Sequence, residues 1–136
     1  MKAIKTFEPT LDPIIIHQEV SLAQAIKTSG KVILPLPGGY QCCQYDDILY
    51  LKSESNYTIV VFKDRSRRIL AKTLGAVEEG LPQHMFFRVH RSFLVNAAHI
   101  TMVSFASDDS KLVLSNDIEI PISRDKKALI KESFGE

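Results

Sequence analysis

From Val32 onward, the apolar residues of the chain fall into short segments with the two-residue period of β-strands, and turn-forming residues separate these segments. Pro35, Pro37, Gly38 and Gly39 make the first interruption. Further strands are expected at residues 48–51, 58–62, 68–71, 86–89, 93–95, 100–105, 111–114 and 118–121. Short strands joined by tight turns pair with their neighbours in the chain, so the pattern predicts a mainly β fold of antiparallel strands.

Two short helices are expected within this strand-rich region. Thr73 is a suitable N-cap for apolar residues at helical spacing, which predicts a helix over residues 74–81, before Pro82. Ser123 can cap a second helix over about residues 124–133. The region therefore has room for small sheets and two helices.

The first part of the chain has a different pattern. An extended stretch is expected at residues 13–16, and apolar residues behind Ser21 predict a short helix that Gly30 would stop. A chain of 136 residues has the length of one ordinary domain. We therefore expect residues 1–31 to be an N-terminal extension, either a linker or a dimerisation element, and residues 32–134 to form the domain.

Apolar runs and cysteines limit the class of protein. No apolar run approaches the roughly 18 residues that a membrane span requires, and the first ten residues lack the apolar core of a signal peptide. We therefore expect a cytoplasmic protein without membrane contact. Cys42 and Cys43 are adjacent, which suits neither an ordinary disulfide nor a metal site. On a strand their side chains would face opposite ways.

Positive charge is clustered rather than abundant. The formal net charge is only +1, which is not the strongly basic balance of many nucleic-acid binders. Cations nevertheless gather in three stretches: residues 63–72, residues 88–91 and residues 124–131. Local patches of this kind can attract a polyanion, although most such runs are solvated surface.

Signatures of catalysis and of cofactor binding are missing. Gly38 and Gly39 lack the third glycine of a dinucleotide-binding loop, and the four histidines lack the helical spacing of a zinc protease. A His90–Ser92 dyad is conceivable, but no orienting acid is evident nearby. Asp46 and Asp47 could be imagined as a metal-binding pair, but neighbours on a strand point to opposite faces, so a role in a turn or at the start of a strand is expected instead. We expect no enzyme activity, no cofactor and no metal.

One stretch is unusually specific. Residues 87–96 read F-R-V-H-R-S-F-L-V-N, and Ile100 follows four residues later. This resembles the signature of the LytTR family of bacterial DNA-binding domains. Neighbouring segments agree in order, namely D-I-L-Y-L at 47–51, S-N-Y-T at 55–58, K-T-L at 72–74 and I-P-I-S-R at 120–124. The resemblance covers roughly residues 32–134.

The resemblance implies a fold of short antiparallel strands in small sheets that places loops, not a recognition helix, in the major groove. It implies base contacts by Asn56, Tyr57, Arg91 and Arg124. These residue types suit that role, because Arg can bond two acceptors of guanine and Asn can pair with adenine. Contacts with the DNA backbone are expected from Arg88, Ser92, Ser123, Lys126 and Lys127.

Several of these side chains also have structural interpretations. Arg88 can be an ion-pair partner, and His90 and Asn96 can satisfy backbone groups inside a packed β motif. The aromatic residues are expected in the core rather than as platforms for base stacking; these are Tyr50, Phe86, Phe87, Phe93 and Phe105.

The expected function is sequence-specific transcriptional regulation by a homodimer on repeated promoter half-sites in double-stranded DNA. The dimer would compensate for the weak non-specific affinity that a small net charge predicts. Family resemblance also implies a receiver domain or a sensor kinase pathway, so the chain is either a stand-alone regulator or part of a longer response regulator. The alternative is a protein-interaction module that keeps the fold without specific DNA binding.

Overall fold

Ten strands form three antiparallel sheets in the computed structural model, which describes residues 20–106 and 108–135. The strands are β1 (Lys31–Leu36), β2 (Gly39–Gln44), β3 (Ile48–Glu54), β4 (Tyr57–Phe62), β5 (Arg67–Leu70), β6 (Phe86–His90), β7 (Phe93–Asn96), β8 (Ile100–Ser104), β9 (Lys111–Leu114) and β10 (Glu119–Pro121). Strands β1 and β2 form a hairpin, the central sheet has the order β5-β4-β3-β7-β6, and the third sheet has the order β10-β9-β8. The predicted mainly β fold of small antiparallel sheets is confirmed.

The described part of the chain also holds three α-helices and two short 3-10 turns. The helices are α2 (Leu22–Thr28), α3 (Leu74–Glu79) and α4 (Arg124–Ser133), and the 3-10 turns are Tyr45–Asp47 and Ala97–His99. Helix α3 ends earlier than predicted, because Gly80 is its C-cap. The extended stretch expected at residues 13–16 lies outside the described residues. In the described part of the chain, no helix is long and apolar enough to cross a membrane.

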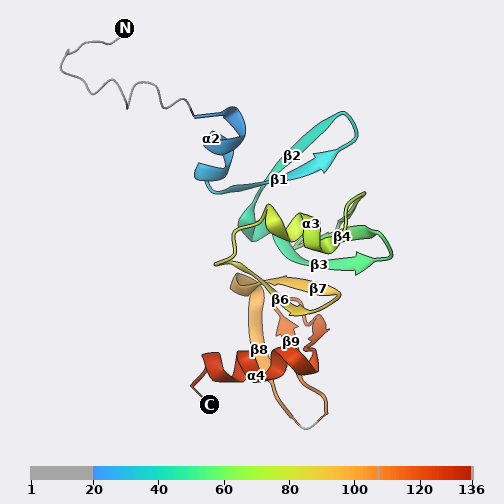
Figure 1. The fold of residues 1–136 in the computed structure, drawn as a ribbon, viewed down its shortest axis with the longest axis vertical. Helices are drawn as coiled ribbons and strands as arrows, with labels where there is room; N and C mark the ends of the chain where they lie inside the picture. Colours follow the sequence, from blue (N-terminus) through green and yellow to red (C-terminus); the bar gives the residue numbers. More distant parts are fainter. Residues whose placement is uncertain (1–19, 107, 136) are drawn as a thin grey trace, which may run out of the picture.

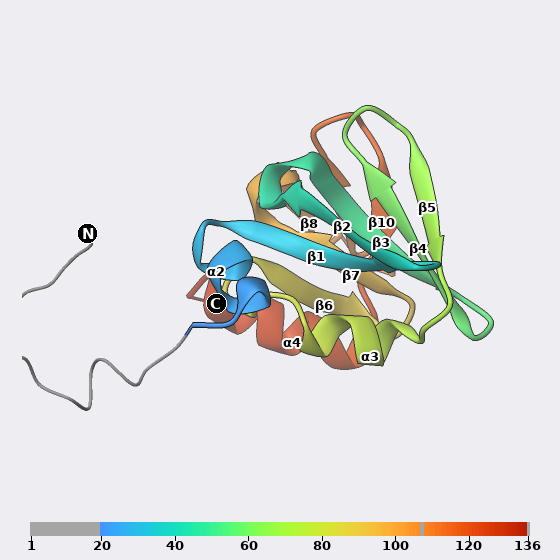
Figure 2. The ribbon, with the colours of Figure 1, turned by 90° about the horizontal axis from the view of Figure 1, so that it is seen from above.

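The five-stranded sheet lies between two hydrophobic cores. On one side, Leu51 and Val60 pack with Val32 of the β1–β2 hairpin and with Leu74 of α3. The other core holds Leu49 and Val61 with residues of the three-stranded sheet. Figure 1 shows the hairpin above the central sheet and the three-stranded sheet with α4 below it, and Figure 2 shows the hairpin lying across the central sheet.

Strand β3 illustrates how the sequence supports this arrangement. Its first four residues, Ile48, Leu49, Tyr50 and Leu51, are all buried. A strand in the middle of a sheet that is covered on both faces needs apolar side chains in both directions. The adjacent cysteines follow the ordinary alternation instead, with Cys42 exposed and Cys43 buried, as predicted.

Two local predictions need correction. Phe87 was expected in the core, but it is 48% exposed. It lies in the edge strand β6 and lines a groove together with Leu129 of α4, which is itself exposed. Ser123 occupies the N-cap position of α4, but its side chain makes no capping hydrogen bond. The caps at Ser21 and Thr73 do make this bond.

Candidate nucleic-acid interface

Three connections converge at one end of the central sheet: the β3–β4 turn, the β6–β7 turn and the junction between β10 and α4. The backbone N–H of Ser53 donates to the carbonyl oxygen of Ser92 over 2.9 Å, which joins the first two. The N–H of Ser123 donates to the carbonyl oxygen of Val89 over 3.0 Å, which joins the third to β6. All three lie on the right-hand side of Figure 1.

The β3–β4 turn presents two of the predicted base-contacting residues. Glu54 pairs with Tyr57, so Ser55 and Asn56 form a two-residue turn. Ser55 has a φ of 57°, in the left-handed region that tight hairpins use. Asn56 is exposed, and Tyr57 is 51% exposed. Both side chains are therefore accessible to a ligand at this end of the sheet.

The β6–β7 turn presents Arg91. Strand β6 has a register shift between Arg88 and His90, which leaves Val89 as the extra residue of a β-bulge. Arg91 is exposed at the turn and Ser92 is half-buried. The backbone N–H of Ser92 donates to Nδ1 of His90 over 3.0 Å, and the His90 ring makes an edge contact with Phe93.

Arg88 lies behind this turn rather than at its tip. Its guanidinium forms an ion pair with Glu78 of α3, with 2.7 Å between Nη1 and Oε1. Its Nε donates to the carbonyl oxygen of His90 over 3.0 Å, and Nη2 donates to the carbonyl oxygen of Arg91. The ion-pair interpretation of Arg88 is confirmed. The sequence did not indicate that Glu78 is the partner of Arg88, because ten residues and a change of element separate the two.

The junction between β10 and α4 presents Arg124 at the first residue of the helix, where it is exposed. Lys126 and Lys127 lie in the same first turn and are half-buried. The hydroxyl oxygen of Ser123 is inaccessible to solvent and has no hydrogen-bond partner in the described structure. In this conformation that hydroxyl is not available to a phosphate.

The β6–β7 turn and the junction between β10 and α4 line one shallow hollow. Its volume is about 710 Å³, and its lining residues are Arg88, His90, Arg91, Ile122, Ser123, Arg124, Asp125 and Lys126. Cationic side chains outnumber the single carboxylate of Asp125 around it. A hollow with this charge favours a polyanion over a neutral ligand.

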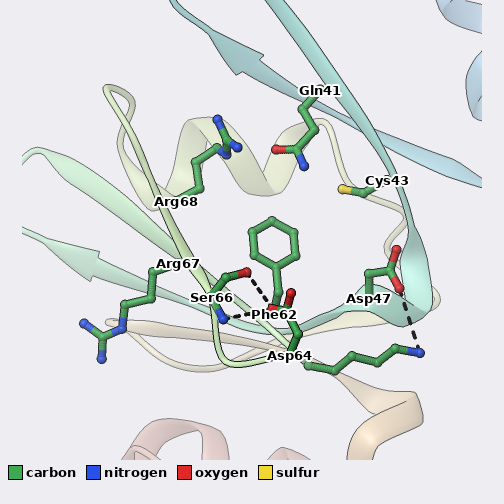
Figure 3. A pocket seen from close by; sticks show the side chains of 9 residues that line it. Gln41, Cys43, Asp47, Phe62, Asp64, Ser66, Arg67 and Arg68 are labelled. Atoms are coloured by element: carbon green, nitrogen blue, oxygen red, sulfur yellow. Dashed lines mark hydrogen bonds and ion pairs between the residues drawn. The ribbon is translucent and has the colours of Figure 1, made fainter.

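The first part of the cationic stretch, residues 63–67, does not join this surface, whereas Lys72 follows β5 beside the β3–β4 turn, where its carbonyl oxygen accepts from Thr58 Oγ1 over 2.8 Å. Lys63 follows β4 at the end opposite to Asn56, and its Nζ lies 2.6 Å from Asp46 Oδ2, which lowers the pKa of Asp46. A separate cavity of about 360 Å³ lies here, and the ring of Phe62 is part of its lining (Figure 3). The side chain of Arg67 points away from that cavity. Charge around Lys63 is therefore mixed, and it lies at the end of β4 opposite to the β3–β4 turn.

Comparison with known proteins identifies relatives of this architecture. The family model of the LytTr DNA-binding domain matches residues 39–135. The sensory transduction protein LytT of Bacillus anthracis is 30% identical over 112 residues, which are 82% of this chain and 45% of that protein. The transcriptional regulatory protein BtsR of Salmonella typhi is 29% identical over 93 residues, which are 68% of this chain and 38% of that protein. The chain thus spans less than half the length of these relatives.

A solved structure shares the fold. It is the LytTr DNA-binding domain of a putative methyl-accepting/DNA response regulator from Bacillus cereus, with a TM-score of 0.65 and 24% sequence identity. The match covers 79% of this chain and 98% of that one. At this level of identity, the likeness establishes the arrangement of the strands and helices.

Proposed function

The chain belongs to the LytTR family of DNA-binding domains, and from this premise we propose that it is the sequence-reading part of a transcriptional regulator. The observation that carries the proposal is the convergence of the three connections that present Asn56, Arg91 and Arg124. These side chains come from separate parts of the chain and are all exposed at one end of the central sheet.

Base contacts are assigned to Asn56, Tyr57, Arg91 and Arg124. An arginine can donate two parallel hydrogen bonds to O6 and N7 of guanine, and an asparagine can bond N6 and N7 of adenine. Because the side chains project from loops and from the start of a helix, they can enter the major groove without a recognition helix crossing it.

Backbone contacts are assigned to Ser92, Lys126 and Lys127. Lysine suits this role as a mobile point charge that attracts phosphate without reading sequence. The start of α4 adds its partial positive charge. Arg88 and Ser123 remain weaker candidates, because the guanidinium of Arg88 is already engaged and the Ser123 hydroxyl is shielded.

The regulator is proposed to act as a homodimer on repeated half-sites, about 10 bp apart, on one face of the duplex. With a net charge of +1, one copy has little long-range attraction for DNA, and two linked copies would gain affinity through avidity. A receiver domain or a sensor kinase pathway would supply the input signal. No catalytic role is proposed, and among the described residues no group of three or more His, Cys, Asp or Glu side chains could hold a metal ion.

A protein-interaction module is the second candidate. Large apolar side chains are exposed around α2 and the β1–β2 hairpin, including Leu22 at 78% and Tyr40 at 72%. Exposed apolar surface of this kind often marks a contact with another protein. Truncation of residues 1–30 separates the two candidates: the interaction module loses its partner, whereas a DNA reader keeps its affinity per protomer.

Selection of bound sequences from a random duplex library, at two salt concentrations, tests the proposal. A DNA reader recovers a repeated motif with helical-turn spacing, and that motif persists at the higher salt. Recovery of unrelated sequences, with binding that salt removes, would contradict specific recognition and favour the interaction module.

A further inference from the structure

Four backbone groups of the β6–β7 turn have hydrogen-bond partners, namely the carbonyl oxygens of His90, Arg91 and Ser92 and the N–H of Ser92. The carbonyl oxygen of Arg91 accepts from Arg88, and the N–H of Ser92 donates to His90 Nδ1. The carbonyl oxygen of Ser92 accepts from the backbone N–H of Ser53. A turn fixed in this way carries the exposed Arg91 side chain on a rigid base.

Arg88 makes the largest share of these contacts. Nη2 and Nε donate to the carbonyl oxygens of Arg91 and His90, and Nη1 bonds Glu78. The side chain of Arg88 is 24% exposed and that of Glu78 is 34% exposed. Partial burial lessens screening of the ion pair by water, and hydrogen bonds to a charged group are stronger than neutral ones.

Glu78 fixes the direction of the guanidinium. It lies in α3, which is anchored in the core by Leu74 and Val77 and is N-capped by Thr73. A planar guanidinium that bonds a carboxylate on a rigid helix has little freedom to rotate, so its remaining N–H groups point at the carbonyl oxygens of the turn.

From these contacts we propose that the Glu78–Arg88 pair is a positioning clamp that holds the β6–β7 turn so that Arg91 is preorganised for reading a base. Arg88 then acts through the turn rather than by touching DNA, and Glu78 takes part in recognition although it is acidic. The inference rests on the proposed function for the role of Arg91. The clamp itself is a property of the free protein.

The first test needs no DNA. Amide hydrogen exchange is measured at Arg91 and Ser92 in the wild-type chain, in Glu78→Gln and in Glu79→Gln. Glu79 is the matched control, because it is the exposed neighbour of Glu78 on α3. The clamp predicts exchange at Ser92 that is about tenfold faster or more in Glu78→Gln, and unchanged exchange in the control. Equal exchange in all three proteins would overturn the clamp.

The second test separates positioning from direct phosphate contact. Binding is measured to the duplex that the wild-type chain selects and to a random duplex of equal length, at several salt concentrations. The clamp predicts that Glu78→Gln weakens binding to the selected duplex more than to the random one, with the same salt dependence. If Arg88 instead contacts phosphate, release from Glu78 strengthens binding to both duplexes, which would overturn the inference.

Two substitutions of Arg88 complete the design. Arg88→Lys keeps the positive charge but cannot make three bonds in a fixed fork, so the clamp predicts losses close to those of Arg88→Gln. A phosphate contact predicts near wild-type binding by Arg88→Lys, and a salt slope reduced by about one in Arg88→Gln. If the wild-type chain selects no sequence, the proposed function fails, whereas the exchange measurement still decides the clamp.

Discussion

The side-chain amide of Asn96 donates a hydrogen bond of 2.9 Å to the carbonyl oxygen of Ile48, 48 residues earlier in the chain. The same Nδ2 donates to the carbonyl oxygen of Tyr45, and Oδ1 accepts from the N–H of Ala98. Asn96 is completely buried. One side chain therefore ties the end of β7 to the start of β3, next to it in the central sheet, and its structural interpretation from the sequence is confirmed.

Replacement of Asn96 by alanine should lower the free energy of unfolding by about 2–4 kcal/mol, because it leaves buried backbone groups without partners. Chemical denaturation monitored by circular dichroism measures this loss. Asn116→Ala is the matched control, since neither polar atom of the Asn116 side chain has a hydrogen-bond partner in the described structure. An equal cost at the two positions would show that the Asn96 bonds contribute nothing specific.

Arg124→Ala and Arg91→Ala should each weaken binding to the selected duplex by about 1–3 kcal/mol, with much smaller losses on a random duplex. A side chain that contacts a particular base adds binding affinity chiefly on a duplex that carries this base at the contacted position. Fluorescence anisotropy with the two duplexes provides the measurement. Arg67→Ala is the control, because Arg67 begins β5 at the end of the central sheet opposite to the β3–β4 turn. Its side chain also points away from the cavity at that end (Figure 3). Equal losses on both duplexes would contradict the assignment of base contacts.

Lys126→Ala and Lys127→Ala should weaken binding to all duplexes alike. A phosphate contact releases condensed counterions, so each substitution should reduce the slope of log K against log salt by about one. Titration at four or more salt concentrations measures the slope. A selective loss on the selected duplex would instead assign the lysine to base recognition.

Strand positions were predicted well from the sequence, because they depend on local patterns: the alternation of apolar residues within a segment and the turn-forming residues at its ends. The strands expected at residues 111–114 and 118–121 are an example: they form β9 and β10, and between them Asp117 has a φ of 66°, which suits a tight turn between antiparallel strands. The capping position of Ser123 was also located correctly, but not the missing hydrogen bond of its side chain. Whether a cap is made depends on packing, which local sequence does not determine.

Placement of the three loops at one end of the sheet could not be derived from periodicity. It depends on β7 pairing with β3 and on the contact between Ser123 and Val89, which are long-range relationships. The family resemblance indicated which loops to consider, since its motifs include Asn56, Arg91 and Arg124. The pairing of Glu78 with Arg88 had no comparable signal, because an acidic residue on a short helix is usually ordinary solvated surface.

Alkylation by iodoacetamide at pH 8 should modify Cys42 and spare Cys43. Burial raises the pKa of the Cys43 thiol to about 11, so only about one molecule in a thousand is thiolate at pH 8. Mass spectrometry of Cys42→Ser should therefore show almost no label in the folded protein and full label in denaturant. Rapid labelling of folded Cys42→Ser would contradict the buried position of Cys43.

The same thiol predicts a pH dependence of stability. Folding raises the pKa of the Cys43 thiol above its ordinary value of 9.0. The contribution of the protonated thiol to the free energy of unfolding is therefore fully present below about pH 9 and is lost as the pH rises towards 11. Denaturation of the wild-type chain and of Cys43→Ala between pH 8 and pH 11 isolates this contribution as the difference between the two curves. Parallel curves would show that Cys43 does not titrate differently in the folded and unfolded states.

Phe86 and Phe87 are adjacent in β6, but their substitution by alanine should lower the free energy of unfolding by very different amounts. Phe86 is 4% exposed and packs in the core beside Leu74 and Leu94, so its loss should cost about 3–5 kcal/mol of unfolding free energy. Phe87 is 48% exposed, and its loss should cost less than about 1 kcal/mol. Denaturation of the two variants under one condition measures the difference. A large cost for Phe87→Ala in the dilute protein would mean that this ring is covered in solution, for example by another copy of the chain, and sedimentation of the wild-type chain would then reveal the larger assembly.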